Sequence, residues 1–199
     1  MNKEATNLLE VYLNDSRRQF RALKKQADRA LAQVSDADWF VTLDAEANSL
    51  AVIVKHIAGN LRSRWTDIFT TDGEKPDRHR DTEFELTADD TKDALQAYWE
   101  KCWGILFTTI DSLQADDLGR TILIRNEPHC VIEAINRQLM HYAGHVGQIV
   151  FLAKHLASDH WHSLSIPRGE SVTFNAGAQP KRGNIWETTQ PETKPHVTG

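Results

Sequence analysis

The sequence has few cysteines, no long apolar run and no excess of positive charge. Its two cysteines, Cys102 and Cys130, stand far apart in 199 residues and form no CxxC pattern, so we expect reduced, partly buried thiols and no disulfide framework. The longest apolar run, Leu50 to Val54, is far too short to cross a membrane. A net charge of −5 and a pI near 6.0 supply no basic patch for nucleic acid.

The start of the chain also lacks the features of a targeting segment. Met1 is followed by a polar stretch without the apolar core of a signal peptide, so we expect a cytoplasmic protein. The composition is ordinary, because 40% hydrophobic and 26% charged residues are typical of a globular domain. That is enough apolar material for a core without a disulfide or a structural metal.

Four segments have apolar residues at the three- and four-residue spacing of a helix. They cover about residues 5–33, 49–69, 88–112 and 129–156. We expect Asn48 and Thr87 to cap the second and third helices and Pro128 to open the fourth. Residues 121–124 favour a short extended piece, whereas the dense charge of 74–85 argues against regular structure there.

These segments predict an all-α protein of the four-helix-bundle class, because long helices joined by moderate loops bury their apolar faces against one another. The periodicity ends after Ser158, and residues 160–175 are expected to form an ordered irregular strap on the bundle. We therefore predict one domain over residues 1–175. Residues 176–199, dominated by Gly, Pro, Thr and Gln, are expected to be a flexible tail.

The pair His141 and His145 lies within the fourth segment at i, i+4 spacing. Residues so spaced project from one helix face about 6 Å apart, and here they share the sector of Ala134 and Ile149, which favours an inward orientation. Two such imidazoles can bind one metal ion. The residue after His141 is Tyr142, so the pair lacks the glutamate of HExxH and gives no support to a zinc peptidase.

His56 borders the apolar face of the second segment and is the expected third ligand. Three imidazoles leave a coordination position open, as in catalytic rather than structural metal sites. Asn60, Gln138 and Gln148 lie one or two turns from the histidines and are candidates to orient the rings or a ligand. The alternative is that the histidines are hydrogen-bonded core residues and the three amides line an interface.

Four strings of the sequence carry a resemblance to a known family. They are residues 49–67 (SLAVIVKHIAGNLRSRWTD), 70–76 (TTDGEKP), 131–154 (VIEAINRQLMHYAGHVGQIVFLAK) and 164–175 (LSIPRGESVTFN). With them the chain resembles the DinB/YfiT-like superfamily of metalloenzymes, in its DUF1572 branch, over roughly residues 5–175. The resemblance implies an up-down-down-up four-helix bundle and a homodimer. It also implies a divalent metal, nickel or zinc, on His56, His141 and His145.

Some members of the superfamily are transferases that use a low-molecular-weight thiol such as bacillithiol. We therefore expect a metal-dependent enzyme, with thiol transfer favoured over hydrolysis. The other alternative is a non-catalytic, metal-stabilised helical dimer, because the sequence offers no Ser/His/Asp arrangement or carboxylate pair. The carboxylates of a small thiol would need cationic anchors, and the candidates are Arg64 and Arg168, with Arg78 and Arg80 as further possibilities. Each arginine has an alternative role in a surface ion pair.

Overall fold

The structure is a computed structural model that describes residues 3–177, and it is mostly helical. Its α-helices are α1 (Lys3–Leu31), α2 (Leu50–Trp65), α3 (Lys92–Ser112), α4 (Val131–Ala157) and the short α5 (Ser171–Ala176). Two strands, β1 (Thr121–Ile124) and β2 (Glu127–Cys130), form an antiparallel hairpin. Short 3-10 helices cover Ala37–Phe40, Arg80–Phe84, Ala115–Gly119 and Ser158–His160.

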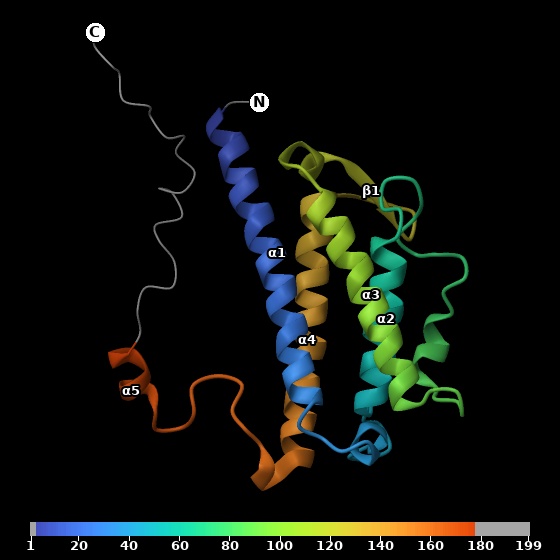
Figure 1. Ribbon diagram of the computed structural model, residues 1–199. Coiled ribbons are helices and arrows are strands. Elements are labelled where there is room, and N and C mark those ends of the chain that lie inside the picture. The colour runs from blue at the N-terminus through green and yellow to red at the C-terminus, as the bar shows by residue number, and fades with distance from the viewer. Residues whose placement is uncertain (1–2, 178–199) are drawn as a thin grey trace. The chain divides into compact units, whose positions relative to one another are not determined.

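The chain divides into two compact units, Met1–His162 and Ser163–Gly199. In the first unit the four long helices lie side by side (Figure 1), with α1 packed on α3 and α4, and α2 packed on the same two helices. The apolar stripes expected from the sequence meet in this core. Trp103, Tyr142 and Phe20 are among its largest fully buried side chains, and their burial stabilises the arrangement of helices that positions the site.

The N-cap of α2 lies one residue further along the chain than the sequence suggested. Ser49, not Asn48, is the N-cap, and its hydroxyl oxygen accepts a hydrogen bond from the Val52 amide at 3.3 Å. The helix also ends at Trp65 rather than near residue 69. Asp67 has a φ of 48°, in the left-handed region that α-helices cannot continue through.

Helix α3 likewise starts later than expected. Its cap is Thr91, whose hydroxyl accepts from the Ala94 amide at 3.2 Å. The predicted cap, Thr87, instead belongs to a turn in which its amide and hydroxyl both donate to Asp90. The prediction was wrong because Asp90 completes this preceding turn and its carboxylate also binds Lys55.

Pro128 does not open α4, contrary to the expectation. It lies in β2, paired with Leu123 of β1, and the predicted extended piece 121–124 is this β1 strand. The hairpin turns at residues 125–126, with φ values of 57° and 60°, as two-residue hairpin turns require. The N-cap of α4 is Cys130, whose amide donates to the carboxylate of Glu133 at 2.8 Å.

Two segments expected to be irregular contain short helices. The loop of residues 74–85 includes the 3-10 helix Arg80–Phe84, and the segment 160–175 leads into α5. These pieces are too short to show a periodic apolar face. The flexible tail predicted from residue 176 lies, beyond Gly177, outside the described residues. Within the described part, no helix combines the length and the apolar character needed to cross a bilayer, in agreement with the sequence.

Candidate metal centre

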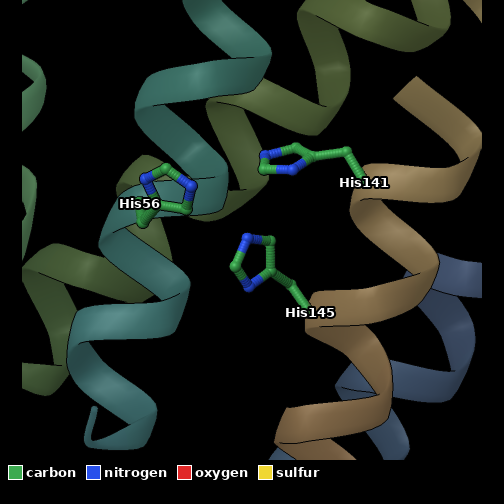
Figure 2. Close-up of side chains that lie close together, drawn as sticks. All are labelled: His56, His141 and His145. Carbon is green, nitrogen blue, oxygen red and sulfur yellow. The ribbon is translucent and has the colours of Figure 1, made fainter. Parts of the chain in front are cut away.

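The packing of α2 on α4 brings three imidazoles together. His56 comes from α2, and His141 and His145 come from successive turns of α4; Figure 2 shows the three rings converging. Their ring centroids are 4.6 to 5.4 Å apart. One potential ligand atom from each lies within 4.8 Å of the others. Because metal–imidazole bonds are about 2.0–2.1 Å long, small ring rotations would bring these atoms onto one ion.

Glu83 fixes the ring of His56. The Nδ1 of His56 donates to Oε2 of Glu83 at 2.8 Å, and both side chains are buried. With the proton on Nδ1, the Nε2 lone pair is left for a metal, in the manner of a carboxylate–histidine–metal triad. This role could not be predicted from the sequence, because Glu83 stands 27 residues from His56 in a segment without periodicity.

Arg78 holds the Glu83 carboxylate from the other side. Its Nε donates to Oε1 at 2.8 Å and its Nη2 to Oε2 at 2.9 Å. Burial raises the pKa of Glu83, but the hydrogen bonds from His56 and Arg78 outweigh burial and hold that pKa below its usual value. The carboxylate is therefore ionised and has both oxygens occupied, so its role is to orient His56.

Gly59 makes room for this contact on α2. A Cβ added at Gly59 would lie 2.2 Å from Oε1 of Glu83 and 2.8 Å from its carboxyl carbon. Gly59 lies within a helix. Glycine is needed there because it has no side chain, and not because of an unusual φ. Any larger residue would displace the carboxylate from His56.

The two histidines of α4 are also prepared to act as ligands. The Nδ1 of His145 donates to Oε1 of Gln148 at 2.8 Å, which leaves its Nε2 free. The Nε2 of His141 is buried and has no hydrogen-bond partner in the described part of the chain. Burying a nitrogen without a hydrogen-bond partner costs free energy. A metal ion would supply that partner, and the two neighbouring imidazoles would suit the same ion.

Burial keeps these imidazoles neutral. Burial, followed by the charges of the other two histidines and of Arg64 and Arg78, lowers the pKa of His141 to about 3. Burial also lowers the pKa of His145, although its hydrogen bond to Gln148 opposes the shift. Metal ligation requires the neutral imidazole, so no proton has to be displaced from these two rings near neutral pH.

The other predicted orienting residues lie nearby with different partners. Asn60 is buried and its Oδ1 accepts from the hydroxyl of Tyr142 at 3.0 Å, while that hydroxyl accepts from Nε1 of Trp65 at 3.2 Å. Gln138 is buried and its Oε1 has no partner among the described residues. Of the three amides, Gln148 contacts a histidine, whereas Asn60 and Gln138 line the adjoining cavity.

A cavity of about 410 Å³ adjoins the histidines, which is within the usual size range of small-molecule sites. His56 and His141 are part of its wall. The rest of the lining comes from Asn60, Gln138, Met140 and five arginines, Arg64, Arg78, Arg80, Arg125 and Arg137. Two of the three predicted metal ligands thus face a space that a small molecule can enter.

The predicted anchors fall into two groups. Arg64, Arg78 and Arg80 line the cavity, whereas Arg168 belongs to the second unit and stays a prediction. Arg125 and Arg137 were missed. Arg137 could have been found, because it precedes His141 by four residues on the same helix face; Arg125 lies in the hairpin turn, and its place is set by tertiary structure alone.

The chain matches a family of unknown function over most of its length. The sequence model of this family, described as "Protein of unknown function (DUF1572)", covers residues 7–170. The chain therefore belongs to the DUF1572 family, as its sequence strings suggested. No curated protein matches the chain.

Proposed function

We propose that this DUF1572 protein is a metal-dependent enzyme whose divalent metal is held by His56, His141 and His145. The observation that carries the proposal is that one potential ligand atom from each of the three histidines lies within 4.8 Å of the others, in a cluster where the Nε2 of His141 is buried without a hydrogen-bond partner among the described residues. Nitrogen donors of this kind suit nickel or zinc, among other transition metals. The assignment to the DinB/YfiT-like superfamily, and the four-helix bundle that it implies, are part of the same proposal. The packing of α1 and α2 against α3 and α4 supports them.

The cavity favours an enzyme over a metal-stabilised structural protein. A structural site has all its positions filled by protein groups. Here the described cluster contains three protein donors and no cysteine or carboxylate, and two of the donors line a cavity. The three histidines would hold the metal, and the adjoining cavity would admit a substrate to it. The homodimer expected from the resemblance remains part of the proposal.

Within the enzyme class, thiol transfer fits the surroundings better than hydrolysis. When bound, the metal would supply the positive charge that lowers the pKa of a substrate thiol. Hydrolysis also benefits from a protein base that accepts a proton from water. No aspartate or glutamate is among the residues that line the described cavity, and Glu83 has both oxygens engaged. A thiol such as bacillithiol, with carboxylates for the arginines, is therefore the preferred reactant class.

Metal analysis of untagged protein tests the centre. After reconstitution with zinc or nickel, we expect about one tightly held ion per chain. We expect His56→Ala and His145→Ala to lose it, because two imidazoles are a much poorer site. His155→Ala removes an exposed histidine from the same helix and is the matched control. Undiminished metal in the first two variants would show that the proposed centre is wrong.

Calorimetry of the zinc-loaded protein tests the reaction class. Bacillithiol, glutathione and cysteine are titrated in parallel, and the S-methylated form of each serves as a control that keeps the carboxylates. Thiol transfer predicts that at least one free thiol binds more tightly than its S-methyl form. If none binds and the loaded protein turns over simple esters or amides, the hydrolase alternative replaces the thiol proposal.

A further inference from the structure

The cavity beside the histidines carries more positive than negative charge. Five arginines line it, and their ion pairs involve only three carboxylates in the described part of the chain, Glu74, Glu83 and Asp81. One carboxylate, that of Glu74, forms ion pairs with three of these arginines, Arg64, Arg78 and Arg125. Arginines gathered in a concave wall focus a positive potential into it. The protein as a whole is acidic, with a net charge of −5, so this local excess runs against the overall composition.

Three of the five arginines retain donors that the described protein does not use. Arg137 is exposed and makes no hydrogen bond or ion pair there. Arg80 makes one long ion pair, 3.6 Å to an Asp81 side chain that is 97% exposed, and its guanidinium lies over the Phe84 ring. The side chain of Arg64 is only 5% exposed, and its buried Nε has no hydrogen-bond acceptor among the described residues.

The buried Nε donor of Arg64 lacks an acceptor, so the site needs a group that can accept its hydrogen bond. Leaving it unpaired costs free energy, and Arg64 cannot lose its proton near neutral pH to relieve that cost. An oxyanion matches the need, because carboxylate and phosphate oxygens accept the parallel N–H groups of arginine. Gln138 also lines the cavity, and its buried Oε1 has no partner among the described residues; an oxygen of this kind accepts a hydrogen bond and so suits a hydroxyl or amide donor on the same ligand.

We propose that the cavity binds an oxyanion group of a small substrate, a carboxylate or a phosphate, through Arg80 and Arg137 at its rim and Arg64 in its wall. The substrate class is then a compact anion with a hydrogen-bond donor for Gln138. Its reacting group would lie toward His56 and His141, which share the same cavity. The catalytic meaning of this anion site rests on the proposed metal centre, whereas anion binding itself depends on the arginines.

Calorimetry with simple anions tests the proposal on full-length protein treated with a chelator. Inorganic phosphate and succinate are the probes, and the tighter of the two identifies the preferred oxyanion; glycerol is the uncharged comparison. We expect binding of at least one anion, weakened by added salt. Arg80→Ala and Arg137→Ala should each weaken it about ten-fold, and the double variant by more, as expected for charge-assisted hydrogen bonds.

Two control variants keep the test decisive. Arg18→Ala removes the same charge from the surface of α1, where Arg18 pairs with Asp15, and should leave anion affinity unchanged. His145→Ala removes a metal ligand that is not among the residues lining the cavity, and it should keep anion binding while losing metal. Both rim arginines are exposed, so circular dichroism should show that their variants fold.

Three outcomes would overturn the proposal. The first is that neither anion binds at millimolar concentration. The second is that the wild type and the Arg80/Arg137 double variant bind the anion equally well. The third is that His145→Ala loses anion binding while the arginine variants keep it. The last result would mean that the anion binds through the histidine cluster. Because metal content is measured on the same variants, a failure of the anion site is distinguished from a failure of the metal centre.

Discussion

Gly59 determines how closely the Glu83 carboxylate approaches His56. In an ordinary helix, replacing glycine by alanine stabilises the fold by up to about 1 kcal/mol. At this position the new Cβ would lie 2.2 Å from a carboxylate oxygen that Arg78 also holds. We expect Gly59→Ala to destabilise the protein by about 1–3 kcal/mol instead, because hydrogen bonds to a buried charge are lost. Urea unfolding monitored by circular dichroism measures the change.

The control for this substitution is Gly144→Ala on α4. Apart from its chain neighbours and the adjacent backbone of α4, no atom lies within 4 Å of a Cβ built at Gly144, so alanine should be neutral or stabilising there. Metal affinity provides a second readout, since loss of a carboxylate that orients a metal-binding histidine typically weakens binding about 10–100-fold. Equal stability changes in the two variants would contradict the role assigned to Gly59.

At the residue scale, helical periodicity accounts for what the sequence could predict of the site. His141 and His145 are half-buried and point toward His56 of α2 (Figure 2) because they share a helix face with Ala134 and Ile149, and Gln148 follows on the next turn. Glu83 could not be predicted in this way. It comes from a loop whose path is set by contacts with α2, and no regular spacing relates it to His56.

At the scale of elements, the start of α2 depends on one hydroxyl. Ser49 is 1% exposed and caps the Val52 amide. We expect Ser49→Ala to cost about 1 kcal/mol, because the amide loses its acceptor in a buried position. Differential scanning calorimetry should show a melting temperature lower by about 2–4 °C, as such a change gives in a domain of this size.

Asn48→Ala is the matched control, because Asn48 is the adjacent, exposed residue of the same preferred cap type. Its substitution should change the melting temperature little. A larger loss from Asn48 than from Ser49 would restore the cap expected from the sequence. That sequence prediction failed by one residue because both side chains have the chemistry of a cap, and only the backbone path decides which oxygen meets the free amides.

The start of α4 illustrates the same limit. Proline is favoured in the first turn of a helix, and this preference alone suggested Pro128. In the structure Pro128 is paired in a two-stranded hairpin, where an edge position tolerates its missing N–H. Four-residue strands leave too short an alternation in the sequence to compete with the longer helical pattern that follows.

At the scale of the molecule's first unit, the cavity depends on contacts between segments distant in sequence. The amide of Gly73, in the loop that follows α2, donates to the Leu123 carbonyl of β1 at 2.7 Å. Glu74 binds Arg125 of the hairpin turn as well as Arg64 of α2. These contacts bring the arginines to one cavity wall. They could not be predicted from the sequence, because neither loop carries a periodic pattern that fixes its partner.

Asp72 holds these two loops together and gives the fold a pH dependence. Its carboxylate accepts from the backbone amides of Glu74, Arg125 and Asn126 at 2.6 to 2.8 Å. Burial raises the pKa of Asp72, but the three amides outweigh burial and hold that pKa below the ordinary value of 3.8. The unfolded chain therefore binds this proton more readily, so the stabilisation is complete well above pH 3.8 and is lost as the pH falls through the folded pKa.

We expect Asp72→Asn to lower the free energy of unfolding by about 1–2 kcal/mol at neutral pH, because the amide group replaces a charged acceptor of three N–H groups with a weaker one. The difference from the wild type should shrink steadily as the pH falls below 3.8 and through the folded-state pKa of Asp72, where the aspartate is itself becoming neutral. Urea unfolding across this range measures it. Asp81→Asn, at a 97% exposed side chain outside this loop contact, is the control. A difference that stays constant with pH would mean that the carboxylate charge of Asp72 does not stabilise the contact between the loop and the hairpin.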